Sequence, residues 1–223
     1  MTDVKLALDH ASLKARQRAQ RHAWPQPLAL RVHRALSWLY RAEQEPEDHD
    51  ARFIFLWLAF NAAYAQEFPN RREFSETRLL LQFLSRLIDA DRDNLLYELV
   101  WTRYPSSIRL LIDNRYVYQP YWDYVNGYLT EAEWQERFDR SRASARRALG
   151  EGRTKKLFAA TFERLYVLRN QVLHGGATWN SRINRDQIRD GANILGDVVP
   201  IVIHLMMEHA YSVWGEACYP VVE

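Results

Sequence analysis

Apolar residues recur at steps of three and four along most of this chain, which is the spacing that puts them on one face of an α-helix. The clearest case is the stretch 153–174, whose inward stripe stops just before Gly175-Gly176. The stripe consists of Leu157, Thr161, Leu165, Leu168 and Val172. Neither strand-like alternation nor an internal repeat is visible. The pattern therefore predicts an all-α protein with negligible β content.

The same spacing predicts further helices between loops that contain proline, glycine or clustered acids. Their expected ranges are 28–41, 51–68, 74–89, 91–104, 130–149 and 184–214. Range 51–68 is apolar around most of its circumference, so it should be a helix near the middle of a bundle. Thr130 and Glu133 have the spacing of a capping box, and Pro200 should kink the final helix.

The 223 residues, 48% of them hydrophobic, are enough for one sizeable core. We expect 1–27 to be a polar surface helix or a loose arm, and 28–223 to be a single helical domain. Within this domain, 104–150 forms an aromatic and basic insertion. Its aromatic residues and arginines predict either a surface that stacks unpaired bases or a short helix packed on the core.

The formal net charge is only +2, so any contact with RNA must come from a local cluster of basic residues. The single cysteine, Cys218, excludes an internal disulfide and a zinc site built from cysteines. No cofactor or metal is expected. The N-terminus lacks the apolar core of a secretory signal, and the longest apolar run is shorter than a membrane span. We therefore expect a cytoplasmic protein without a membrane partner.

Candidate chemistry lies at the end of the stripe 153–174, in Arg169, Asn170 and His174. An imidazole can move a proton near neutral pH, and a guanidinium holds a phosphate without losing its charge. A left-handed Gly175 would let the backbone turn and direct His174 back beside Arg169. These groups suffice to cleave RNA without a metal, because RNA carries its own nucleophile, the 2′-hydroxyl.

Two motifs resemble the HEPN superfamily. Arg169-Asn170-x-x-x-His174 is similar to its Arg–polar–x–x–x–His motif, and Trp57-x-x-Phe60-Asn61-x-x-Tyr64 resembles an early core helix of its stand-alone and ApeA-like branch. The resemblance implies a HEPN-like helical bundle with extra peripheral helices. It also implies a homodimer through the motif helix and a metal-independent endoribonuclease of toxin–antitoxin or antiviral defence systems. An antitoxin or a defence-complex partner is a further implied possibility.

In this interpretation His174 is the general base or acid, Arg169 neutralises the phosphorane, and Asn170 contacts phosphate or orients His174. The products would be a 2′,3′-cyclic phosphate and a 5′-hydroxyl. Because Gly175 and Gly176 replace the His-x-Tyr continuation of some toxins, adenylylation at that tyrosine is not expected. The alternative is a catalytically inactive HEPN module that binds RNA, a nucleotide or a protein.

Two further sets of polar residues have open interpretations. Asn61, in an apolar helix, either bridges neighbouring helices or orients Arg169 or His174 from behind. A basic tail after residue 140 is either an RNA groove or a solvated helix face. Its candidate RNA-binding residues are Arg142, Arg146, Arg147, Arg153, Lys155 and Lys156.

Overall fold

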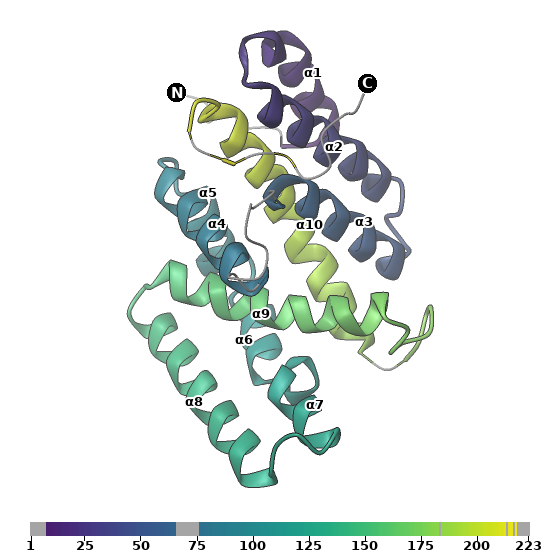
Figure 1. Ribbon diagram of the computed structural model, residues 1–223, viewed down its shortest axis with the longest axis vertical. Coiled ribbons are helices and arrows are strands. Elements are labelled where there is room, and N and C mark those ends of the chain that lie inside the picture. Colours follow the sequence, from purple (N-terminus) through teal and green to yellow (C-terminus); the bar gives the residue numbers. More distant parts are fainter. Residues whose placement is uncertain (1–7, 66–75, 183, 213, 216, 218–223) are drawn as a thin grey trace. The chain divides into compact units, whose positions relative to one another are not determined.

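A computed structural model describes residues 8–65, 76–182, 184–212, 214, 215 and 217 of the chain (Figure 1). The described residues form α-helices joined by short turns, with brief 3₁₀ and π segments and no strand. The predicted all-α class is therefore confirmed for this part of the chain. The chain divides into two compact units, Met1–Arg92 with Ala192–Glu223, and Asp93–Gly191. Each unit is described by itself below.

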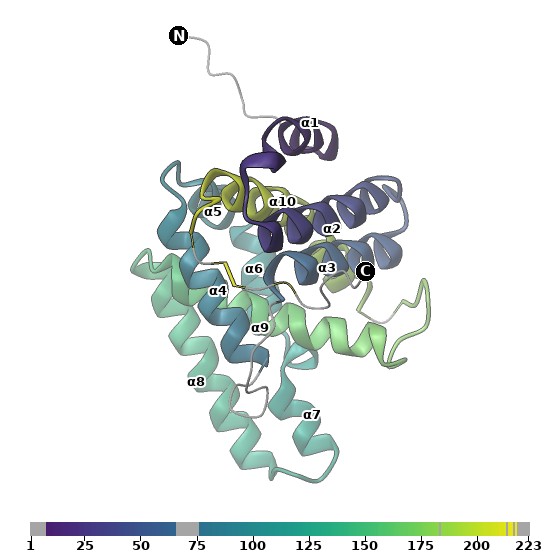
Figure 2. The same cartoon turned by 45° about the horizontal axis from the view of Figure 1, so that its top comes forward.

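The first unit is built on a hairpin of α2 (Gln26–Glu43) and α3 (His49–Tyr64), which lie side by side in both views (Figures 1 and 2). Its elements are α1 (His10–Gln20), η1 (Arg21–Ala23), α2 (Gln26–Glu43), α3 (His49–Tyr64), α4 (Glu76–Ala90) and most of α10 (Arg185–Glu208). Helix α3 is the buried helix predicted for 51–68, with Phe53, Trp57 and Phe60 at most 1% exposed. Residues 66–68 of that range lie outside the described residues.

The described part of the predicted N-terminal segment takes the helical alternative, because α1 packs against α2 and η1 continues from α1. Residues 1–7 of that segment lie outside the described residues. Leu13 and Gln17 face inward and are buried, whereas the arginines of α1 face outward or reach α10. Arg16 Nη1 lies 2.9 Å from His204 Nδ1. Hydrogen bonds between side chains thus fasten α1 to the last helix of the same unit.

An arginine that the sequence analysis did not single out ties three backbone segments of the first unit together. Arg31, on α2, is 1% exposed, and its guanidinium donates to the carbonyl oxygens of Ala63, Trp214 and Gly215. A buried guanidinium is tolerated only when its donors are satisfied. Here the Arg31 guanidinium donates to carbonyl oxygens at the end of α3 and after α10, because carbonyls at a helix end have no partner within the helix.

The second unit is organised around α9, which contains the candidate motif. Its elements are α5 (Leu95–Glu98), the π-helix η2 (Leu99–Arg103), α6 (Pro105–Asp113), η3 (Arg115–Val117), α7 (Gln119–Val125), α8 (Glu131–Gly150), α9 (Thr154–Leu173) and the first turns of α10. Helices α8 and α9 form a hairpin, and α6 and η3 pack against α9 while α7 packs against α8 (Figure 1). The predicted range 153–174 is confirmed almost to the residue.

The predicted capping box is also confirmed at the start of α8. The Thr130 hydroxyl accepts from the Glu133 N–H at 3.3 Å, and the Glu133 carboxylate accepts from the Thr130 N–H at 2.8 Å. The Thr130 N–H and the Thr130 hydroxyl both donate to Glu133 Oε2, and these two hydrogen bonds lower the pKa of the Glu133 carboxyl. The two residues together satisfy donors that the first turn of a helix leaves open.

Two predicted boundaries were wrong. The helix expected from 91 begins only at Leu95, because Asn94 adopts a left-handed conformation with φ of 58° and starts a new turn. The final helix ends at Glu208 rather than near 214, and residues 209–212 form a turn. Pro200 lies inside this helix, as expected. By length and composition α10 could cross a membrane, but 78% of its most apolar window is buried, as in many core helices.

Candidate functional site

The three motif residues occupy the last turn of α9 and the residue that follows it. Arg169 and Asn170 are half-buried, whereas His174 is exposed and is the C-cap residue of α9. The backbone N–H of His174 donates to the Asn170 carbonyl at 3.0 Å. The inward stripe places Leu165 and Leu168 in the core, so Arg169 lies at the edge between core and solvent. The structure thus puts a guanidinium and an imidazole at one open helix end.

The backbone favours glycine at both positions after His174. Gly175 has φ of 75°, the left-handed conformation predicted for it, which residues other than glycine rarely adopt. At Gly176 an added Cβ would lie 3.0 Å from the backbone oxygen of Gln171, which is a tight contact. The absence of a side chain at both residues therefore eases the turn of the chain at the end of α9.

Arg169 is held in place by its neighbours on α9. Its Nη1 donates to Asn170 Oδ1 at 2.9 Å, and its guanidinium lies 5.5 Å from the centre of the Tyr166 ring. Because Asn170 Oδ1 accepts from Arg169, the amide NH₂ is the group of Asn170 that can donate to a phosphate. The side chains of Arg169 and Asn170 therefore form a hydrogen-bonded pair with several N–H donors.

Gln171, which the sequence analysis missed, fixes the turn to two other segments of the second unit. Its Nε2 donates to the Tyr116 carbonyl of η3 at 2.5 Å, and its Oε1 accepts from Asn184 Nδ2 at 3.1 Å. The same Tyr116 carbonyl also accepts from Trp122 Nε1 at 2.8 Å. Gln171 is three residues before His174 and thus on a neighbouring face of the same helix end.

The aromatic insertion mostly packs on α8, which favours the packing alternative. Ring centres are 5.2 Å apart for Tyr118 and Phe138, and 5.1 Å apart for Tyr121 and Trp134. Tyr116 differs, since it is 41% exposed and lies under the guanidinium of Arg115 at 4.9 Å.

A buried arginine next to this aromatic packing was also missed. Arg164, on α9, is 1% exposed, and its guanidinium lies 4.2 Å from the centre of the Tyr118 ring and 3.1 Å from Ser141 Oγ. Burial lowers the pKa of Arg164. Its long apolar stem and planar head join η3, α8 and α9, and no pattern in the sequence distinguishes it from exposed arginines.

Ion pairs engage part of the predicted RNA groove on α8. Asp113 accepts from Arg142 Nε at 2.8 Å and from Arg146 Nη2 at 3.1 Å, and Arg153 pairs with Glu151 at 2.5 Å. Burial alone would raise the pKa of Asp113, but the hydrogen bonds from both arginines lower it below its usual value. Carboxylates thus offset the charge of three of the six candidate residues.

The other three candidates, Arg147, Lys155 and Lys156, are exposed. Whether any of the six contacts RNA stays a prediction. Asn61 lies on α3, in the first unit, and its Oδ1 is buried without a hydrogen-bond partner among the described residues. Its proposed support of Arg169 or His174, which belong to the second unit, likewise stays a prediction.

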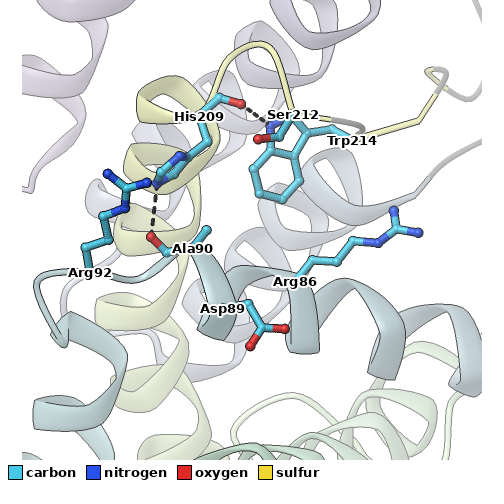
Figure 3. A pocket seen from close by; sticks show the side chains of 7 residues that line it. All are labelled: Arg86, Asp89, Ala90, Arg92, His209, Ser212 and Trp214. Atoms are coloured by element: carbon cyan, nitrogen blue, oxygen red, sulfur yellow. Dashed lines mark hydrogen bonds between the residues drawn. The ribbon is translucent and has the colours of Figure 1, made fainter.

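The first unit contains a cavity of about 490 Å³ between α4 and the turn after α10 (Figure 3). Arg92 and Arg86 approach it from different sides, and Ser212 and Trp214 complete its wall (Figure 3). His209 Nε2 donates to the Ala90 carbonyl at 3.0 Å, which caps the end of α4. Helix α4 ends here with its negative pole, so helix capping accounts for His209 in this cavity.

Among the described residues, no three histidine, cysteine or acidic side chains gather as metal ligands would. Comparison of the chain with protein-family models, with curated proteins and with solved structures finds no match. The HEPN resemblance accordingly rests on the two motifs quoted above.

Proposed function

We propose that the protein is a metal-independent endoribonuclease of the HEPN type. The observation that supports this function best is the open end of α9, where an exposed imidazole follows a half-buried guanidinium on one terminal turn. Two glycines that suit the backbone shape the turn, and Gln171 holds it. Such a fixed arrangement suits a group that must meet a substrate in one geometry.

The reaction needs three contributions. A base removes the proton of the 2′-hydroxyl, whose oxygen then attacks the phosphorus. Arg169, with the amide NH₂ of Asn170, stabilises the negative charge of the phosphorane. An acid protonates the departing 5′-oxygen, which leaves a 2′,3′-cyclic phosphate and a 5′-hydroxyl. His174 supplies the base or the acid, a role that typically contributes about 10²–10⁴-fold in rate.

One chain offers one imidazole in this turn, whereas base and acid are two roles. We therefore propose a symmetric dimer in which two motif turns line one cleft. Two large apolar residues close to His174 in the sequence support this arrangement, since Leu173 is 40% exposed and Trp179 is 73% exposed. Exposed apolar groups beside polar ones are typical of association surfaces.

Sedimentation equilibrium tests the dimer with a pair of matched variants. Trp179→Asp should shift the protein toward monomer and lower cleavage. Tyr128→Asp changes another exposed aromatic of the same unit, 79% exposed, and should leave the mass unchanged. A wild-type protein that is monomeric at concentrations where it cleaves RNA would contradict the shared cleft.

The alternative function is an inactive module that binds RNA, a nucleotide or a protein. The hydrogen bond between Arg169 and Asn170 favours it, because two motif side chains partly satisfy one another. In this alternative His174 only complements the negative end of α9.

Incubation of the purified protein with labelled RNA and EDTA separates the two functions. The proposal expects cleavage in EDTA that falls by about 10²-fold or more in His174→Ala. It also expects no cleavage of a strand whose scissile nucleotide lacks the 2′-hydroxyl. His22→Ala is the matched control, since His22 is an exposed histidine that follows Arg16 at a similar spacing. RNA binding without cleavage would support the inactive module.

The resemblance also suggests a toxin or anti-phage role, which we include in the proposal. Expression of the wild-type chain in bacteria should then slow growth, and His174→Ala should relieve the effect. Equal growth inhibition by both proteins would contradict a toxic ribonuclease. A neutralising partner would be found as a protein that restores growth and binds the wild-type chain.

A further inference from the structure

A stripe of basic side chains runs along α1 and η1 and continues onto α2 in the first unit. Lys14, Arg18 and Arg21 are spaced by four and three residues, so they point to one side of the helix. From α2, His33 comes within reach of this stripe, with its Nδ1 3.4 Å from Lys14 Nζ. Arg18, Arg21 and His33 are exposed. We call Lys14, Arg18, Arg21 and His33 the basic stripe.

Among the described residues, the charged groups that shift the pKa of Lys14 and of His33 are themselves basic. Burial lowers the pKa of Lys14, and the charges of Arg18 and Arg21 lower it further. Burial likewise lowers the pKa of His33, followed by the charges of Lys14, Arg21 and Arg34. Folding therefore gathers like charges at a free-energy cost, which is a feature of binding sites for ions of opposite charge.

Two acids of the first unit are engaged at the other end of α1. Asp9 caps the helix by accepting from the Ser12 N–H at 2.8 Å, and Glu43 accepts from the His10 N–H at 2.8 Å. On α8, Asp113 and Glu151 pair with the arginines that the sequence made candidates for RNA. By contrast, Lys14, Arg18 and Arg21 form no ion pair with an acid among the described residues, so their positive charge is not offset there.

We propose that the basic stripe of the first unit binds the phosphodiester backbone of a single-stranded nucleic acid. The helical rise places Lys14 and Arg18 about 6 Å apart along the axis, and Arg21 about 4.5 Å further, which suits consecutive phosphates. A phosphate between Lys14 and His33 would accept hydrogen bonds from both. Beyond the acid end, the His10 and Tyr40 rings lie 4.8 Å apart, and Tyr40 is 52% exposed, which offers a surface for a base.

A membrane fits the stripe less well than a nucleic acid does. Helices that bind lipid surfaces expose an apolar face beside their basic one. In α1 the only large apolar side chain among the described residues is Leu13, and it is buried against the first unit. The proposal does not depend on cleavage by the second unit, because its residues and contacts are separate from the motif.

Fluorescence anisotropy of the full chain with a labelled DNA strand of about 12 nucleotides tests the proposal. DNA lacks the 2′-hydroxyl, so the proposed nuclease cannot destroy it. Arg18→Gln with Arg21→Gln should lower the affinity about tenfold at about 0.15 M salt, and should reduce the slope of log affinity against log salt by about 1.4. Circular dichroism must show an unchanged helix content.

The matched control is Arg137→Gln with Arg140→Gln on α8. Both pairs are exposed arginines three residues apart, so both proteins lose two positive charges from one side of a helix. The control should bind the strand like the wild type. An equal or larger loss in the control overturns the proposal and restores α8 as the binding surface.

His33 gives the binding a pH dependence that a general charge effect lacks. A phosphate favours the protonated imidazole, so the affinity should rise as the pH falls from about 7.5 to about 6. In His33→Gln this rise should be largely lost. Absence of binding by the wild type, or an affinity for acidic peptide or anionic vesicles but not for the strand, overturns the proposal. Cleavage of RNA by a chain that fails this test would leave the nuclease function intact.

Discussion

Alanine at Gly175 should destabilise the second unit, whereas alanine at Gly150 should stabilise it. At both positions the added Cβ meets no heavy atom within 4 Å beyond the adjacent chain. The difference is in the backbone, because Gly175 has φ of 75° and Gly150 is the last residue of helix α8. The same chemical change therefore isolates the conformation of the turn that follows His174.

The expected magnitudes follow from this contrast. A left-handed alanine costs about 1–2 kcal/mol, because its Cβ approaches the carbonyl oxygen of the chain. At Gly150 the replacement removes freedom from the unfolded chain and should gain about 0.4–1 kcal/mol. The two variants should thus differ by roughly 2 kcal/mol, or roughly 5 °C in Tm. Gly175→Asn should fall between them, since asparagine tolerates this conformation best.

Urea unfolding followed by circular dichroism and by tryptophan fluorescence measures both variants. The two signals also show whether the units unfold together, which decides whether one free energy of unfolding applies. If Gly175→Ala gained stability as Gly150→Ala does, Gly175 would not be left-handed. The account of how the chain turns after His174 would then be wrong.

Three other perturbations test the fold. Thr130→Ala should cost about 1 kcal/mol of unfolding free energy through the lost cap of α8, and Thr130→Ser should restore it. Arg31→Met should cost roughly 3 kcal/mol in chemical unfolding, because it strips two buried carbonyls and one part-buried carbonyl of their donor; a loss below that of Thr130→Ala would contradict this role. The pKa of His33 is lowered on folding, so the unfolded chain binds more protons, and stability should fall as the pH drops through 6.5. His33→Gln should flatten that part of the pH profile; an unchanged profile would refute it.

Local patterns were enough to predict most elements of the chain. The stripe of Leu157, Leu165 and Leu168 marks α9, Thr130 with Glu133 marks the start of α8, and Gly175 marks the turn. These features depend on residues within one or two turns of each other. The wrong start at 91 has a local cause as well, since the left-handed Asn94 interrupts a run whose apolar spacing continues.

The sequence by itself therefore determined the helices, their buried faces and the position of the motif at a helix end. Only the tertiary structure decided which basic side chains are paired with an acid and which are not. Asp113 reaches Arg142 from 29 residues away, and Lys14 meets His33 from 19 residues away. It also decided that Arg31 is buried, that Gln171 holds the Tyr116 carbonyl, and that aromatic rings of the insertion pack against α8. The reason is that helix formation follows from neighbours along the chain, whereas the pairing and burial of a side chain depend on which distant segment packs against it.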